Sequence, residues 1–75
     1  MEEKIIAILN GIDPAIESYD GSNMLEDGTI DSFEVIDIVA ALEEEFGTEI
    51  DAALVIAENF ANKEAIIKMM RGVLG

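Results

Sequence analysis

The stretch from Asp31 to Gly47 constrains the fold of this chain most, because it carries the start signal, the body and the stop signal of one long helix. Asp31 or Ser32 suits the N-cap position, and Asp31 followed three residues later by Glu34 resembles a capping box. Gly47 suits the left-handed position that follows a helix. The pattern therefore predicts a helix over residues 32–46. Its core-facing side consists of apolar residues at helical spacing, namely Val35, Ile38, Val39, Leu42 and Phe46.

A shorter helix is predicted near the N-terminus, over residues 2–10. Apolar residues from Ile5 to Ile12 recur at helical spacing there, and Gly11 is suited to end the helix. Residues 13–30 then form a connection that starts with Asp-Pro. Connections of this length are usually functional or disordered. Their apolar residues predict that this one is ordered but irregular, and these residues are Ile16, Tyr19, Met24, Leu25 and Ile30.

The C-terminal part of the chain has weaker signals. Residues 48–51 are expected to be extended or in a turn, and the apolar run over residues 52–56 has no clear period. A short helix is predicted over residues 57–61. Asn62 suits the cap of a last helix over residues 63–73. The buried side of that helix is expected to consist of Ile66, Met69 or Met70, and Val73.

The sequence predicts an all-α fold, because alternating strand patterns with hairpin turns are absent. We expect a small up-and-down bundle of three main helices plus one short helix. Residues 1–75 contain no internal repeat and no linker, which predicts a single domain.

The chain is strongly acidic, with 17 Asp and Glu against 4 Lys and Arg and a formal net charge of −13. Such a surface repels nucleic acid and anionic lipid, and it attracts partners with basic patches. No segment has the pattern of a signal peptide, and no apolar run approaches the ~20 residues that span a bilayer. Together with the absence of Cys, these features predict a cytoplasmic monomer that binds neither nucleic acid nor membrane.

The chain contains neither His nor Cys, so it lacks the usual base and the usual thiol for chemistry near neutral pH. It has no glycine-rich phosphate loop, and carboxylates on the surface of a helical bundle have no cleft to raise their pKa. These absences predict that the protein is not an enzyme. Ser32, at the start of the long helix, is therefore interpreted as a point of attachment rather than as a nucleophile.

The long helix has a second apolar stripe in addition to its core-facing side. This stripe consists of Phe33, Ile36 and Ala40, and the acids around it are Glu34, Asp37 and Glu44. One interpretation is that the helix is central and buried all round. The interpretation that we favour is an exposed apolar patch rimmed by acids, which is the usual mark of a protein interaction site.

Residues 23–34 also align with the twelve-residue loop of an EF-hand calcium site. Asp27, Asp31 and Glu34 fall at ligand positions of that loop. The first position is an Asn, however, and the third is Leu25, which has no side-chain oxygen. Too few oxygen ligands remain for a tight site, so no metal is predicted.

The sequence Asp31-Ser32-Phe33, with a helix that ends Leu-Glu-Glu-Glu-Phe-Gly, resembles an acyl carrier protein or peptidyl carrier protein over residues 2–73. The resemblance implies a four-helix carrier domain in which Ser32 bears 4′-phosphopantetheine as a phosphodiester. The arm would hold an acyl or aminoacyl group as a thioester, and it would bring the thiol that the chain lacks. A phosphodiester anion also suits the N-terminal end of a helix.

The resemblance also implies several partners. A phosphopantetheinyl transferase would attach the arm, and adenylating and acyl-transfer enzymes with basic docking patches would load and unload it. The docking residues implied for these enzymes are Asp31, Phe33, Ile36, Asp37, Ala40 and Glu44.

Two departures from fatty-acid carriers bear on the cargo. Phe33 stands where Leu or Met usually follows the serine, and residues 26–30 differ from the segment that usually precedes it. Residues 26–30 and 57–60 are more similar to discrete D-alanine or nonribosomal-peptide carriers, which favours an aminoacyl or specialised acyl cargo. The alternative is an acidic interaction module with a carrier-like fold that never receives the arm.

Overall fold

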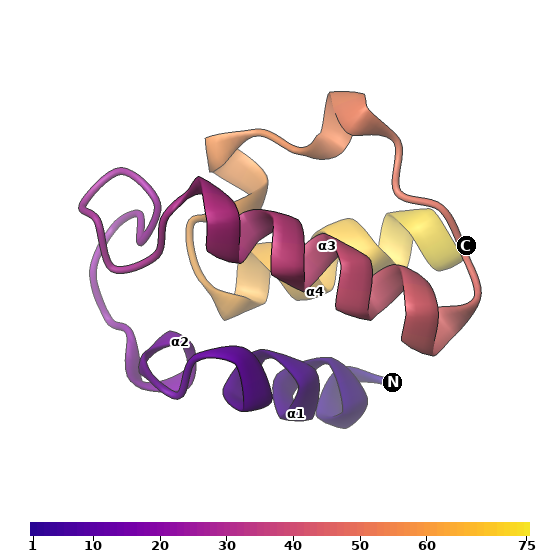
Figure 1. Ribbon diagram of the computed structural model, residues 1–75, viewed down its shortest axis with the longest axis horizontal. Coiled ribbons are helices and arrows are strands. Elements are labelled where there is room, and N and C mark those ends of the chain that lie inside the picture. The colour runs from indigo at the N-terminus through magenta and orange to yellow at the C-terminus, as the bar shows by residue number, and fades with distance from the viewer.

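Helices make up all the regular structure of the chain, and the computed structural model describes every residue from 1 to 75 (Figure 1). The α-helices are α1 (Glu2–Ile12), α2 (Ala15–Ser18), α3 (Ser32–Phe46) and α4 (Lys63–Leu74), and the 3-10 helices are η1 (Ala52–Leu54) and η2 (Ala57–Phe60). No strand is present, so the predicted all-α class is confirmed. The three long helices were expected, whereas three short ones occur where one was predicted.

The ends of α3 lie where the sequence signals placed them. Asp31 Oδ1 accepts a hydrogen bond from the Glu34 backbone N–H at 2.9 Å, so Asp31 is the N-cap. Gly47 adopts a left-handed backbone with φ 59°, and its N–H donates to Glu43 O. Local signals at both ends therefore fix Ser32 as the first residue of α3.

The N-terminal helix is longer than predicted, because Gly11 does not end it. A glycine ends a helix when it takes a left-handed conformation, and Gly11 keeps ordinary helical backbone. α1 continues to Ile12, and the Asp13 N–H donates to Leu9 O at 2.9 Å. Asp13 Oδ1 then accepts the Ala15 N–H at 3.0 Å. Asp13 thus ends α1 and also accepts a hydrogen bond from the first residue of α2, a helix in a segment that was predicted to be irregular.

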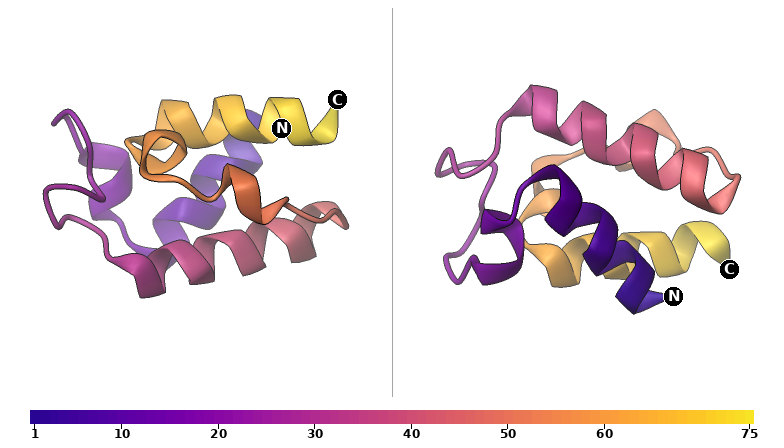
Figure 2. Two further views of the ribbon diagram at one scale, coloured as in Figure 1. Left: turned by 90° about the horizontal axis from the view of Figure 1, so that it is seen from above. Right: turned by 60° about the horizontal axis from the view of Figure 1, so that its bottom comes forward.

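The long helices do not alternate in direction throughout. α1 runs antiparallel to α3 and α4, whereas α3 and α4 run the same way (Figure 1, Figure 2). The expected up-and-down order therefore holds from α1 to α3 and fails for α4. The reason is the connection over residues 47–62, which carries η1 and η2 back along α3 to the end where α3 begins.

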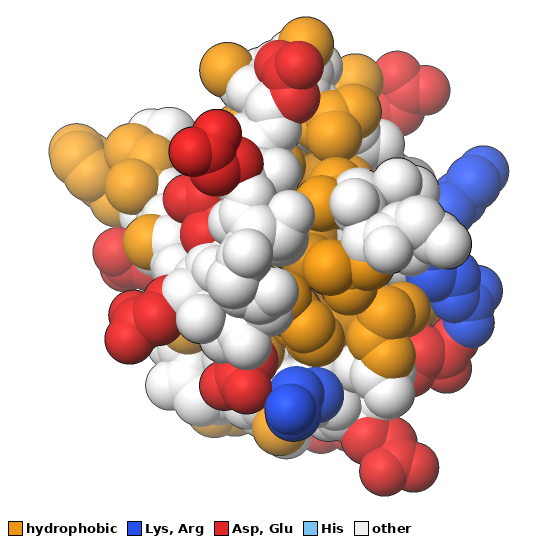
Figure 3. Space-filling model, turned by 90° about the vertical axis from the view of Figure 1, so that its right-hand side faces the viewer, with side chains coloured by type: hydrophobic (Ala, Val, Ile, Leu, Met, Phe, Trp, Pro, Cys, Tyr) orange, Lys and Arg blue, Asp and Glu red, His pale blue; other side chains and the backbone are white.

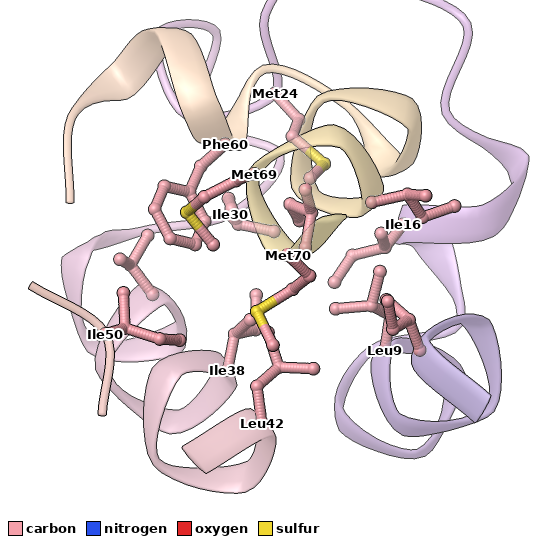
Figure 4. Close-up of a cluster of buried hydrophobic side chains, with 14 residues drawn as sticks. Leu9, Ile16, Met24, Ile30, Ile38, Leu42, Ile50, Phe60, Met69 and Met70 are labelled. Atoms are coloured by element: carbon pink, nitrogen blue, oxygen red, sulfur yellow. The ribbon is translucent and has the colours of Figure 1, made fainter. Parts of the chain in front are cut away.

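The core is one cluster of 14 buried side chains, all of them apolar (Figure 4). Met70 of α4 extends toward Ile38 and Leu42 of α3. On α4, Ile66, Met69 and Met70 are buried as predicted, Ile67 joins them, and Val73 is only half-buried. No helix is long and apolar enough to cross a membrane.

The connection between α1 and α3 is held to this core by the apolar residues that the sequence singled out. Ile16, Met24 and Ile30 are completely or almost completely buried, and Tyr19 and Leu25 pack against the core while partly exposed. The connection is therefore ordered, as predicted, and it delivers Ser32 to the start of α3 in a defined position.

Candidate functional site

Ser32 is exposed at the first position of α3. The Asp31 side chain accepts the Glu34 N–H, and Asp31 O accepts the Val35 N–H at 3.1 Å. The backbone N–H groups of Ser32 and Phe33 have no acceptor in the protein. A phosphate on Ser32 Oγ would lie near these free donors, at the positive end of the helix dipole. The position therefore fits a phosphodiester anion.

Ser32 forms part of the wall of a cavity of about 230 Å³ between α3 and the segment that carries η1 and η2. Phe60 and Val35 are the buried members of this lining, and Leu25 comes from the loop before Ser32. The rest of the lining is also apolar and consists of Ile36, Val55 and Ile56. An apolar surface thus begins beside the serine hydroxyl.

A second cavity of about 230 Å³ continues the first along α3, because Ile36 and Val55 line both. Its other residues are Val39, Ala40 and Glu43. We call the two cavities together the α3 groove. A larger cavity of about 520 Å³ lies between η1, η2 and α4, but Ser32 does not line it. A group attached to Ser32 would therefore lie beside the α3 groove and not beside the larger cavity.

The second apolar stripe of α3 is exposed to solvent. The exposed fractions of Phe33 and Ile36 are 76% and 62%, the two highest among the large apolar side chains. The structure therefore excludes the interpretation in which α3 is buried all round. Val55 and Ile56 are also exposed, at 37% and 45%, and Val55 shares both cavities of the α3 groove with Ile36.

Sequence reasoning did not single out Val55 and Ile56. The apolar run over residues 52–56 has no helical period, and the structure gives it a 3-10 turn followed by irregular backbone. The signal that could have found them is the run itself, since apolar residues that serve no helix face are candidates for an exposed patch. We define the docking patch by its exposed residues Phe33, Ile36, Ala40, Val55 and Ile56.

The acids predicted around this patch fall at different places. Asp31 and Asp37 are exposed near Ser32, at the start of α3. Glu44 is also exposed, but it lies about 18 Å farther along the helix axis, since each residue of an α-helix adds about 1.5 Å. Glu44 therefore flanks the far end of the α3 groove rather than the serine.

Positive charge gathers elsewhere on the molecule. Three of the four cationic residues belong to α4, whose own sequence carries only one acid. Figure 3 shows the end of the molecule where α4 finishes, with Lys and Arg side chains to the right of a strip of hydrophobic atoms and near its lower end. Ser32 belongs to α3, whose sequence contains acids and no Lys or Arg. A basic partner would therefore be attracted to the α3 side of the molecule.

Glu34 does not belong to the acidic rim. It is half-buried, and a hydrogen bond with Asp13 raises the pKa of its carboxyl group. Burial and the negative charges of Asp13, Asp31 and Asp37 raise the pKa further. Glu34 Oε2 has no hydrogen-bond partner. The Asp31 N–H makes no hydrogen bond to Glu34, so the second half of the predicted capping box is missing.

Two of the residues that a calcium loop would use, Asn23 and Asp27, are engaged in other hydrogen bonds. Asp27 accepts hydrogen bonds from Tyr19 and Thr29, and Asn23 Oδ1 accepts from the Leu25 and Glu26 N–H groups at 3.0 Å. No group of three or more acidic side chains is arranged to hold a metal ion. The segment before Ser32 is therefore organised by its own hydrogen bonds.

The comparison with protein families agrees with this geometry. The family model described as the phosphopantetheine attachment site matches residues 3–62. No curated protein and no solved structure matches the chain. Members of the matched family carry 4′-phosphopantetheine covalently on a serine, are modified by phosphopantetheinyl transferase, and work with synthetase and acyltransferase enzymes without catalysing a reaction themselves. The chain belongs to this family and is a carrier protein that binds a phosphopantetheine arm.

Proposed function

We propose that the protein carries acyl or aminoacyl groups on a phosphopantetheine arm attached to Ser32 Oγ. The observation that supports this most is the position of Ser32, which is exposed at the start of α3 and lines the α3 groove. The matched family attaches its arm to a serine, and Ser32 is the serine that combines an open hydroxyl with free helix N–H groups. The other serines, Ser18 and Ser22, lie in α2 and in the loop after it.

The attachment step balances with coenzyme A as the donor. The bond formed joins Ser32 Oγ to the phosphorus next to pantetheine, and the bond broken is the diphosphate P–O bond. Adenosine 3′,5′-bisphosphate leaves, and the serine proton passes to a base of the transferase. When bound, the arm supplies the thiol on which a cargo is held as a thioester.

The residues around Ser32 have separate tasks. Asp31 caps α3 and so places Ser32 at the first position of the helix. The free N–H groups of Ser32 and Phe33 stabilise negative charge on the attached phosphate. The apolar lining from Leu25, Ile36 and Ile56 offers contact to the apolar part of a small cargo.

Partner enzymes are proposed to bind the docking patch and its acids. Phe33 and Ile36 provide apolar contact, and Asp31, Asp37 and Glu44 attract basic surfaces. A carrier must exchange one partner for the next, so we expect weak and salt-sensitive binding. The expected partners are a phosphopantetheinyl transferase, an adenylating enzyme that loads the arm and an acyl-transfer enzyme that unloads it.

The cargo that fits best is an aminoacyl or short acyl group, D-alanine included. The core is filled with buried apolar side chains, and the space beside Ser32 is limited to the shallow α3 groove. A small cargo needs no interior cavity. The likeness of residues 26–30 and 57–60 to discrete aminoacyl carriers supports the same choice.

The test is the intact mass of the purified protein before and after incubation with coenzyme A and a broad-specificity phosphopantetheinyl transferase. The expected gain is one phosphopantetheine, absent in Ser32→Ala and retained in Ser18→Ala and Ser22→Ala. A gain that persists in Ser32→Ala would overturn the assignment of the site. No gain in the wild-type protein, with a control carrier modified in the same tube, would favour the unmodified interaction module.

A further inference from the structure

The loop over residues 20–30 leads directly into Ser32 and protrudes at the end of the molecule where α3 begins (Figure 1). Asp20, Gly21 and Ser22 are exposed in it, as are Glu26 and Asp27. An enzyme that reaches Ser32 Oγ must approach this loop. Its shape is therefore part of the surface that a transferase meets.

Tyr19 and Asp27 close this loop across its base. Tyr19 Oη donates a hydrogen bond of 2.5 Å to Asp27 Oδ2. The other oxygen, Asp27 Oδ1, accepts from the Thr29 N–H at 3.0 Å and from Thr29 Oγ1 at 2.7 Å. The bond from Tyr19, together with those from Thr29, lowers the pKa of Asp27, so the carboxylate stays charged and remains a strong acceptor.

Gly21 makes this closure possible. A β-carbon at Gly21 would lie 2.5 Å from Tyr19 Oη and 2.7 Å from Cζ of the ring. Both distances are too short for a contact between non-bonded atoms. The Tyr19 hydroxyl thus occupies the space that a side chain at residue 21 would need. Any larger residue there must move the hydroxyl away from Asp27.

The closed loop is joined to the wall of the α3 groove. Asn23 Nδ2 donates to Ala57 O at 3.2 Å, and the Met24 N–H donates to Ala61 O at 2.8 Å. Leu25 is the next residue and lines the same cavity as Ser32. The loop and the surface beside the serine hydroxyl are therefore connected by these hydrogen bonds and by Leu25.

We propose that Tyr19, Gly21 and Asp27 are positioning residues for the modification of Ser32, because they hold the loop in the shape that the transferase binds. This inference rests on the proposed function of Ser32. A loop released from the closure occupies the binding shape for only part of the time, and the apparent affinity is multiplied by that fraction. Chemistry within the docked complex is unchanged, so KM rises and kcat stays the same.

The test is the steady-state kinetics of modification by a broad-specificity transferase, with the unmodified carrier as the varied substrate. Tyr19→Phe removes only the hydroxyl, and Gly21→Ala displaces it. Both are expected to raise KM about fivefold, as for a loop that is competent about a fifth of the time, with kcat unchanged. Asn10→Ala is the matched control, since it removes an exposed side-chain hydrogen bond of 2.6 Å to Glu17, between α1 and α2.

The outcomes separate this inference from the proposed function. A raised KM in Tyr19→Phe and Gly21→Ala, with wild-type kinetics in Asn10→Ala, supports the positioning role. Unchanged KM in the two loop variants overturns it, and so does an equal rise in Asn10→Ala, which would reflect a general loss of order. A wild-type protein that is not modified at all would overturn the proposed function, and this inference with it.

Discussion

Glu34, in the first turn of α3, is hydrogen-bonded to Asp13, the residue that ends α1. Glu34 Oε2 is buried there without a hydrogen-bond partner. The hydrogen bond with Asp13, burial, and the charges of Asp13, Asp31 and Asp37 all raise the pKa of Glu34. Glu34 of the folded protein therefore keeps its proton at a pH at which the same residue of the unfolded chain has released it.

Replacing Glu34 by Gln is expected to stabilise the protein near neutral pH. Because the folded pKa of Glu34 is raised, its stabilising contribution is present below the unfolded value near 4.5 and is lost as the pH rises through the folded pKa. Gln stays neutral and avoids that loss. Urea unfolding should give a higher free energy of unfolding for Glu34→Gln at pH 7, and the two proteins should converge toward about pH 4.

The control for this prediction is Glu44→Gln, which removes an exposed acid from the same helix. A chain with net charge −13 gains some stability from the loss of any negative charge. An equal gain in the two variants at every pH would show that general repulsion, and not the contact with Asp13, explains the effect.

Asp27 is expected to show the opposite pH dependence. Hydrogen bonds from Tyr19 and Thr29 lower its pKa, so its stabilising contribution is present above the ordinary value of 3.8 and is lost as the pH falls through the folded pKa. Asp27→Asn should lower the free energy of unfolding at pH 7 and approach the wild-type value in acid. A difference between the two proteins that is constant with pH would contradict the ionic character of this contact.

The parts of the fold that depend on neighbours in sequence could be predicted. Asp31 and Gly47 act within one turn of α3, so the bounds of that helix could be derived from the sequence. The prediction that Gly11 ends the first helix was wrong, because the backbone conformation of a glycine depends on the residues after it. Here α1 ends at Asp13, whose side chain accepts a hydrogen bond from the first residue of α2.

The parts that depend on side-chain hydrogen bonds outside the helical repeat could not be predicted. The connection over residues 47–62 is held by Glu43 Oε2, which accepts the Ile50 N–H at 2.8 Å, and by Asn59 Nδ2, which donates to Leu54 O at 2.8 Å. No local pattern specifies these bonds. They place Val55 across the groove from α3, and the composition of the docking patch therefore emerged only from the structure.

Two glycines should respond to alanine in opposite ways. Gly47 has φ 59°, and an alanine there takes a left-handed conformation that costs about 1–2 kcal/mol. Gly11 lies in ordinary helical backbone with no atom within 4 Å of an added β-carbon, so Gly11→Ala should stabilise the protein by about 0.5–1 kcal/mol. Thermal unfolding of both variants checks the pair, and a stabilising Gly47→Ala would contradict the assigned end of α3.

The docking patch is expected to separate function from stability. Phe33 and Ile36 are exposed, so Phe33→Ala and Ile36→Ala should change the free energy of unfolding by no more than about 0.5 kcal/mol. Leu42 lies on the other side of the same helix and is completely buried, so Leu42→Ala should cost about 2–5 kcal/mol.

Modification kinetics should show the reverse order. Loss of an apolar anchor at the centre of an interface costs more than about 1 kcal/mol, which raises KM about fivefold or more for Phe33→Ala and Ile36→Ala. At a temperature where Leu42→Ala is still folded, its KM should remain near the wild-type value, because Leu42 is not on the surface. Because Asp37 acts at long range, Asp37→Asn should mainly weaken the dependence of KM on salt. If Phe33→Ala and Ile36→Ala are modified with wild-type KM, the transferase binds elsewhere, and the exposed stripe of α3 serves a different partner or none.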